Sequence, residues 1–303
     1  MSNRVKKRHS ILDIIFDSFN YIFITAFSIM CVYPFYYIFI YSISLPKEAA
    51  KGNMYLWPKG FSLTGYIDLL KLSNISQAAL ISVSRTIIGT ALTVVCCALF
   101  AYILQHPKLR FRKIIYRFSI MTMYLGAGLI PYYVLMTKLH LKDNFLLYVI
   151  PSAIGMFNVI LIKTYIESMP KELEESADID GAGPMTVFLR IIFPLSTPII
   201  ATVAIFSAVG QWNTWQDNMY LVSSPKLQTL QLVLLNYLND STANLMALKG
   251  NSNSANQNIT ISQTTPTTIR MTITMIVTMP ILFVYPFFQR FFVGGIMIGA
   301  VKG

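Results

Sequence analysis

The sequence predicts an all-α membrane protein that crosses the bilayer six times. Of its 303 residues, 54% are hydrophobic and 12% are charged, whereas soluble domains average roughly 25% charged residues. The apolar residues form long runs separated by polar loops, and the most basic loops alternate with less basic ones, as in proteins whose cytoplasmic loops are positive. The chain is therefore interpreted as a single membrane domain over residues 1–303.

Three of the predicted spans lie in the first half of the chain. A short basic segment, residues 4–8, precedes the first span at about 12–45, which is too long for a signal peptide and has no cleavage site after it. A turn-rich external loop leads to the second span at about 77–104. The next loop, 106–117, carries five Lys or Arg residues and is expected in the cytoplasm. The third span covers about 118–137.

The third predicted span is interrupted by Gly126, Gly128 and Pro131. Broken helices are tolerated in membranes where protein or a water-filled path surrounds the backbone. The interruption is therefore interpreted either as a hinge beside a translocation route or as a simple packing kink.

The second half of the chain is predicted to contain three further spans and three polar segments. The spans cover about 145–166, 198–220 and 268–288. The polar segments are a cytoplasmic coupling loop at 167–197, an external loop at 221–264 and a cytoplasmic C-terminal tail at 289–303. The external loop contains leucines at helical spacing, which predict a short amphipathic helix: Leu227, Leu230, Leu234 and Leu238. Both termini are expected in the cytoplasm.

The coupling loop contains an acidic segment, residues 170–194, that we call the elbow. Five of the 13 acidic residues of the chain lie in it: Glu172, Glu174, Glu175, Asp178 and Asp180. Acidic side chains suit the first turns of a helix because they interact favourably with its dipole. Gly181 can end this helix, and Pro184 can open a second helix that Pro194 stops. The elbow is therefore predicted to fold as a helix, a tight turn and a second helix.

The spacing of residues in the elbow resembles the EAA loop of the membrane subunits of ABC importers. That loop has the pattern E-A-A-x-x-x-G, nine residues and I-x-L-P. Here the residues at the same spacing are Glu175, Ser176, Ala177, Gly181, Ile191, Phe193 and Pro194. Ser176 and Phe193 depart from the pattern but keep the size or the apolar character of the family residue. The alternative is an ordinary solvated acidic hairpin between two spans.

The resemblance implies a type I ABC importer permease fold with cytoplasmic coupling helices. In that family the loop docks onto a separate ATPase subunit, where its glutamate pairs with a basic residue. The implied coupling residues are Glu175, Ser176, Ala177, Asp180, Gly181, Ile191 and Pro194. The chain itself has no G-x-x-x-x-G-K-[ST] phosphate loop. It is therefore expected to be no enzyme and to hold no cofactor, with ATP bound by the partner ATPase.

Three further stretches resemble the carbohydrate-uptake branch of this family, and within it the second maltose-type permease. They are residues 128–144, 211–234 and 285–303. The resemblance is closest to permeases for polysaccharide or oligouronide fragments. In the maltose-type subunit the C-terminal tail reaches the ATPase dimer interface. The same role is implied for Gly299, Ala300, Val301 and Lys302.

The implied protein is the permease subunit of an ATP-driven importer in a bacterial cell (inner) membrane. Its implied partners are a second homologous permease, two ATPase subunits and an extracellular or periplasmic binding protein that delivers a carbohydrate, expected to be an oligosaccharide. Membrane lipid would surround the spans. No nucleic-acid partner is expected, because the 24 Lys and Arg residues are spread along the loops without a basic, aromatic-interleaved patch.

Candidate sugar contacts come from side chains that combine aromatic faces with amide groups, as in many ligand sites. They are Asn158, Gln211, Trp212, Asn213 and Trp215. For each tryptophan, an anchor at the membrane interface is the competing interpretation. For Asn158, it is a hydrogen bond between two helices.

Other function classes find less support in the sequence. A permease of the same family for a non-sugar solute is the first alternative. An ion-coupled carrier is the second, but the predicted spans contain essentially no Asp or Glu at membrane depth, where such carriers need ionisable groups. The three histidines have no metal-ligand spacing, and no catalytic constellation of a membrane enzyme is present.

Overall fold

The computed structural model is helical over most of the residues it describes, which are 11–49, 51–52, 54–71, 73–107, 109–239 and 267–283. These residues divide into two compact units, one of residues 11–69 and 267–275 and the other of residues 70–239 and 276–283. The predicted C-terminal tail and most of the predicted external loop lie outside the described residues.

The first unit is built on helix α1 (Ile11–Ser42), which covers most of the first predicted span. Its side chains are exposed from residue 11 to residue 36. A helix that is apolar on all sides suits a lipid environment. Two tyrosines of α1 hold the following loop, because Tyr33 and Tyr36 donate hydrogen bonds to the carbonyls of Tyr55 and Leu56. Helix α2 (Pro46–Ala49) and the start of α3 (Thr64–Lys71) complete this stretch.

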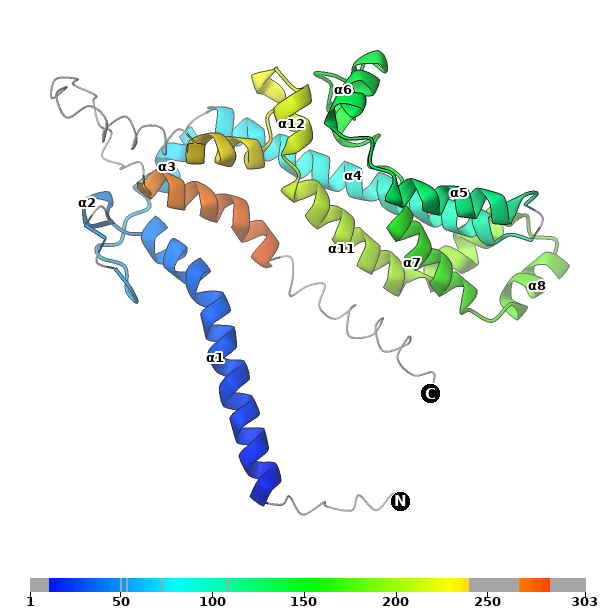
Figure 1. Cartoon of the computed structure of the whole chain (residues 1–303), viewed down its shortest axis with the longest axis horizontal. Helices are drawn as coiled ribbons and strands as arrows, with labels where there is room; N and C mark the ends of the chain where they lie inside the picture. The colour runs from blue at the N-terminus through cyan, green and yellow to red at the C-terminus, as the bar shows by residue number, and fades with distance from the viewer. Residues whose placement is uncertain are drawn as a thin grey trace. The chain divides into compact units, whose positions relative to one another are not determined.

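The core of the second unit consists of three helices that lie side by side (Figure 1): α4 (Ser73–Gln105), α7 (Met156–Glu167) and α11 (Thr197–Asn213). Small and aliphatic side chains fill the space between them, which lets the helices approach closely. The fully buried ones are Cys97, Ala98, Ala101, Leu104, Val159, Ile162 and Val203.

Shorter elements surround this core. They are α5 (Arg112–Tyr124), α6 (Leu129–Lys138), η1 (Phe145–Tyr148), α8 (Glu172–Ile179), α9 (Pro184–Val187), the π-helical turn η2 (Phe188–Ile192), α10 (Phe193–Leu195), α12 (Gln216–Leu221) and η3 (Pro225–Leu227). The helix expected after Leu227 runs from 230 to 239 and buries Leu230, Leu232 and Val233. A further apolar helix covers Thr267–Phe283.

Two helices of the described chain, α1 and α4, are long and apolar enough to cross a membrane alone. Counting each of two bent helix pairs as one span raises this number to four. The first pair is α5 with α6, bent by 118°, and the second joins residues 184–195 to α11 with a bend of 80°. The third predicted span is therefore broken between Tyr124 and Leu129, where the two glycines lie. The six spans stay a prediction.

The fourth predicted span is divided as well. It begins with the single turn η1, continues without regular structure from 149 to 155, and becomes helical only at Met156. Pro151 lies in this irregular stretch and cannot donate a backbone hydrogen bond. Helix α4 supplies one hydrogen-bond partner to this irregular backbone: the hydroxyl of Thr93 donates to the carbonyl of Ser152 at 3.0 Å. Irregular backbone at membrane depth needs such protein partners.

Candidate functional site

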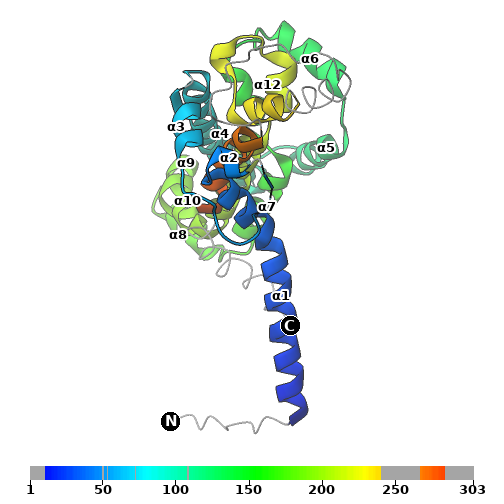
Figure 2. The ribbon, with the colours of Figure 1, turned by 90° about the vertical axis from the view of Figure 1, so that its left-hand side faces the viewer.

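A cavity of about 760 Å³ lies in the second unit, lined by apolar and polar residues of α4, α6, η1, the irregular stretch before α7, α7, α11 and α12. The short helices α6 and α12 lie side by side (Figure 2). They contribute the rings of Tyr132 and Tyr220. Asn158 of α7 and Ser207 of α11 contribute polar groups from the core helices. Aromatic faces combined with a few polar groups are typical of small-molecule sites.

Arg85 of α4 is buried in the wall of this cavity and is paired with Asp217 of α12. The closest contact joins Nη2 of Arg85 to Oδ2 of Asp217 at 2.6 Å, and the two side chains are 4% and 12% exposed. Nη1 also donates to the backbone carbonyl of Thr214 at 3.1 Å, and Nε donates to Oε1 of Gln211 at 2.9 Å. The guanidinium carbon lies 4.6 Å from the ring centroid of Tyr148. The charge of Arg85 is therefore neutralised and its donors are largely used.

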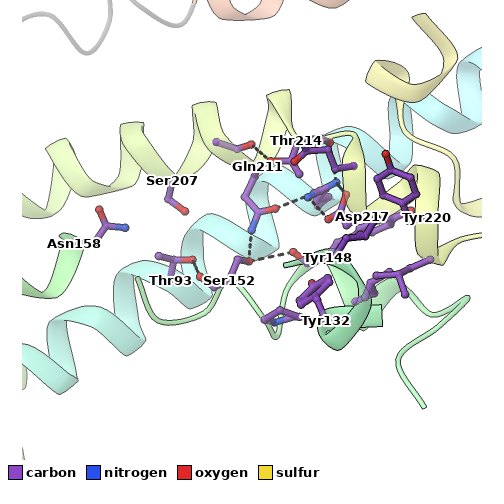
Figure 3. A pocket seen from close by; sticks show the side chains of 17 residues that line it. Thr93, Tyr132, Tyr148, Ser152, Asn158, Ser207, Gln211, Thr214, Asp217 and Tyr220 are labelled. Carbon is purple, nitrogen blue, oxygen red and sulfur yellow. Dashed lines mark hydrogen bonds and ion pairs between the residues drawn. The ribbon is translucent and has the colours of Figure 1, made fainter. Parts of the chain in front are cut away.

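Gln211 extends this network across the core. Its Nε2 donates to the hydroxyl of Ser152 at 2.6 Å, while its Oε1 accepts from Arg85. The amide passes so close to α4 that a Cβ at Gly89 would lie 2.5 Å from Nε2. The network of Arg85, Asp217, Gln211 and Ser152 thus joins α4, α11, α12 and the irregular stretch before α7 (Figure 3). We call it the polar network.

A second set of hydrogen bonds holds the chain beyond the cavity. Asn218 is fully buried, and its Nδ2 donates to the hydroxyl of Tyr148 at 2.6 Å. The Oδ1 of Asn218 accepts from the backbone N–H of Thr229 at 3.0 Å. Tyr148 in turn donates to the carbonyl of Leu227 at 2.6 Å. Buried polar groups are stable when satisfied in this way, so α12 and the 227–229 segment are fixed against η1.

The elbow folds as the sequence predicts, with α8 followed by a turn and a second helical segment. Gly181 has a φ of +77°, a left-handed conformation that glycine adopts without strain. The N–H of Ala182 donates to the carbonyl of Ala177 at 3.0 Å, and the N–H of Gly181 donates to that of Asp178 at 3.1 Å. These two bonds form a Schellman motif, which satisfies carbonyls at the end of α8. Two residues of the predicted motif therefore belong to one helix cap: Ala177 supplies an accepting carbonyl and Gly181 supplies the left-handed residue.

The elbow buries Ala177 and exposes most of its polar side chains. Ala177 is 7% exposed and belongs to a cluster that includes Val187 and Phe188 of the second segment. Glu175, Ser176 and Asp180 are exposed. An exposed acidic face on a rigid, capped helix can contact a basic surface of another protein.

The second segment of the elbow ends in a π-helical turn before its proline. In this turn the N–H of Phe193 donates to the carbonyl of Phe188, five residues earlier. Pro194 has no N–H, and its ring would clash with the carbonyl four residues earlier in a regular helix. A wider turn relieves that clash. Ile191 packs partly against the core cluster, while Pro194 is exposed.

Glu174 connects the elbow to the end of α4. Its Oε1 accepts a hydrogen bond from Nε2 of Gln105 at 3.2 Å. Burial raises the pKa of Glu174, the nearby His106 lowers it to a smaller extent, and Asp178 raises it again. A second cavity, of about 570 Å³, lies beside this contact and includes Arg112 among its lining residues.

The predicted sugar contacts separate into two groups. Asn158 and Gln211 line the first cavity. Trp212 instead donates from Nε1 to the carbonyl of Val277 at 3.0 Å, and Asn213 accepts from Nε2 of Gln231 at 3.2 Å. Trp215 precedes α12 and is not among the lining residues. The predicted tail residues Gly299, Ala300, Val301 and Lys302 lie outside the described residues.

The sequence interpretation overlooked Arg85, the centre of the polar network. A signal was present, because Arg85 is a cation in the middle of an apolar stretch and a buried cation needs a partner. Asp217 is the one acidic residue between 211 and 234, and it is that partner. The tyrosines at 132, 148 and 220 had no comparable signal, because aromatic residues are frequent throughout this chain.

Comparison with known proteins identifies one matching family and several similar proteins. Residues 2–298 match a family described as "Binding-protein-dependent transport system inner membrane component". The chain is 32% identical to the "Polygalacturonan/rhamnogalacturonan transport system permease protein YtcP" of Bacillus subtilis (strain 168), covering 95% of this chain and 99% of that protein. It is 34% identical to "Protein LplC" of the same organism, covering 95% of each.

A solved structure is also similar along nearly the whole chain. It belongs to a bacterial ABC transporter involved in the import of the acidic polysaccharide alginate. The TM-score is 0.83 and the sequence identity is 27%, with 95% of this chain and 100% of that chain covered.

Proposed function

Because the chain belongs to the family of binding-protein-dependent transport system inner membrane components, we propose that its 760 Å³ cavity is one part of the path through which an ATP-driven importer moves an oligosaccharide. The chain is a carbohydrate permease subunit and not an enzyme, in keeping with its relatives. The observation that supports the ATP-driven part of this proposal is the capped elbow, which presents Glu175 and Asp180 to solvent beside a buried Ala177.

The elbow is the proposed contact with the ATPase. Its helix α8 is short, but the Schellman cap and the packing of Ala177 make it rigid enough to transmit a movement of the ATPase to the permease. Glu175 would form a charge-assisted hydrogen bond with a basic residue of the ATPase. Residues Ser176, Asp180, Gly181, Ile191 and Pro194 would shape the docking surface. The C-terminal residues 299–302 are proposed as a second ATPase contact.

The proposed assembly contains a second homologous permease, two ATPase subunits and an external solute-binding protein. ATP would be bound by the ATPase subunits alone. Their closure would move the elbows of both permeases and switch the path between its inward and outward openings. The proposed topology has six spans in a bacterial cell membrane, with the elbow and both termini in the cytoplasm and α5–α6 as a broken third span.

Two similarities favour a carbohydrate over another solute. The relative YtcP is named for polygalacturonan and rhamnogalacturonan transport, and the similar solved structure imports alginate. An ion-coupled mechanism has less support, because the one acid that lines the cavity, Asp217, is already paired with Arg85. A proton or sodium site at that position would need a free carboxylate.

Reconstitution tests the proposal. The chain would be copurified with its neighbouring permease, ATPase and binding protein and placed in liposomes. Uptake of oligosaccharide that requires ATP and the binding protein supports the proposal. Uptake that is driven instead by a proton or sodium gradient without ATP contradicts it.

A further inference from the structure

The polar side chains that line the cavity differ in whether they have partners within the chain. Those of the polar network bond to one another, as described above. A second set of lining side chains, which includes Tyr132, Asn158, Ser207 and Tyr220, forms no hydrogen bond or ion pair within the described chain. In Figure 3, Asn158 and Ser207 lie to one side of Gln211, and Tyr132 and Tyr220 lie to the other.

The partner that suits this second set is a molecule with hydroxyl groups and apolar faces. Half-buried amide and hydroxyl groups need hydrogen-bond partners, and Asn158 and Ser207 provide both donors and acceptors from facing helices. Tyrosine rings offer an apolar face with a polar edge. Tyr220 is 43% exposed, so its ring is accessible from the cavity. A pyranose ring has both of the required surfaces.

The charged residues that line the cavity further limit the kind of ligand that it can bind. Arg85 and Asp217 are the two formally charged residues among those that line the cavity, and they neutralise each other. Asp217 also accepts the backbone N–H of Asn218 at 2.8 Å, which fixes its carboxylate in place. A sugar carboxylate that displaced Asp217 from Arg85 would leave the Asp217 carboxylate buried and unpaired. Such uncompensated buried charges are strongly unfavourable.

We infer that Tyr132, Asn158, Ser207 and Tyr220 form a subsite for the hydroxyl groups and ring faces of pyranose units, and that the Arg85–Asp217 pair is the wall of this subsite and does not bind substrate carboxylates. This inference rests on the proposed function and adds the residues and the sugar surfaces that they contact.

The test compares the number of oligosaccharides imported per ATP hydrolysed by the complete reconstituted complex. The variants are Tyr220→Ala, Tyr220→Phe and Asn158→Ala, with Met219→Ala as the matched control. Met219 is exposed on the same helix but does not line the cavity. Loss of the ring face in Tyr220→Ala should lower the import ratio about fivefold to tenfold. Tyr220→Phe keeps the face and should retain most of the ratio, and Met219→Ala should resemble the native complex.

The outcomes separate the subsite from the proposed function. If Tyr220→Ala and Asn158→Ala import as many sugars per ATP as the native complex, the subsite is wrong while the permease function stands. If the native complex imports no oligosaccharide with ATP, the proposed function itself fails. Should Tyr220→Ala not assemble, Asn158→Ala and Tyr132→Ala carry the same comparison from α7 and α6.

Discussion

Arg85 and Asp217 are separated by 132 positions in the sequence, yet their side chains meet at 2.6 Å in the interior of the second unit. The pair joins the longest helix of this unit, α4, to the short helix α12 that follows the break after α11. Both charges are almost completely buried, so each depends on the other. The pair therefore fixes the position of α12, and with it the cavity wall.

Removing one partner of this pair should be far more harmful than removing both. Arg85→Ala leaves the Asp217 carboxylate buried without a counter-charge, which should cost about 3–5 kcal/mol of stability. The double variant Arg85→Met with Asp217→Leu replaces the pair by apolar side chains and should recover most of this loss. Thermal unfolding of the purified complex in detergent measures both. Equal midpoints for Arg85→Ala and the native complex would contradict the structural role of the pair.

The close approach of Gly89 to Gln211 predicts a clash. A Cβ at Gly89 would lie 2.5 Å from Nε2 of Gln211, so Gly89→Ala must displace the amide from Arg85 and Ser152. We expect a loss of about 1–3 kcal/mol, measured by thermal unfolding. Gly210→Ala is the control, because Gly210 is also helical and nothing lies within 4 Å of its Cβ position. A native-like midpoint for Gly89→Ala would show that the amide is not held there.

The raised pKa of Glu174 predicts a pH-dependent stability of the elbow. Because burial raises the pKa of this carboxyl in the folded state, its contribution is most favourable below its unfolded value and declines as the pH rises through the folded value. At neutral pH the ionised form opposes folding. Glu174→Gln should therefore raise the unfolding midpoint at neutral pH, and this gain should diminish as the pH falls through the raised pKa of the folded state and vanish below the unfolded value of about 4.5.

Glu172→Gln is the comparison for this prediction, since Glu172 is an exposed acid of the same helix. Glu172→Gln should change the unfolding midpoint little, both at neutral pH and at acidic pH. A gain from Glu174→Gln that is the same at all pH values would indicate that the burial of the carboxyl is not its cause.

The elbow could be predicted from the sequence because its signals are local. Gly181 supplies the left-handed residue of the cap and Pro184 opens the next segment, and each acts within a few residues of its position. The apolar runs likewise located α1 and α4, whose lengths follow from continuous hydrophobicity.

The cavity could not be predicted in the same way, because it depends on contacts between distant segments. Glycine and proline marked the break between α5 and α6, but not its 118° bend, which brings Tyr132 to the lining. The sequence predicts Gln211 as a sugar contact, which stays a prediction, but it does not predict that the amide of Gln211 bonds to Arg85 and Ser152. Hydrogen-bond partners 59 or 126 positions away leave no periodic signal in the sequence.

The elbow provides the most direct test of the central claim, that this chain couples an ATPase to sugar movement. Glu175→Ala removes an exposed charge, and Gly181→Leu forces a branched side chain into a left-handed backbone. Gly183→Leu is the matched control, because Gly183 has an ordinary φ of −71° and nothing lies within 4 Å of its Cβ position.

The measurement is the ATPase activity of the reconstituted complex, with and without sugar-loaded binding protein. The account predicts that Glu175→Ala and Gly181→Leu lower the stimulated activity about tenfold or more while the two permeases still assemble, and that Gly183→Leu stays near native. Full stimulation in both elbow variants would contradict the account and would direct the search for the energy source to an ion gradient.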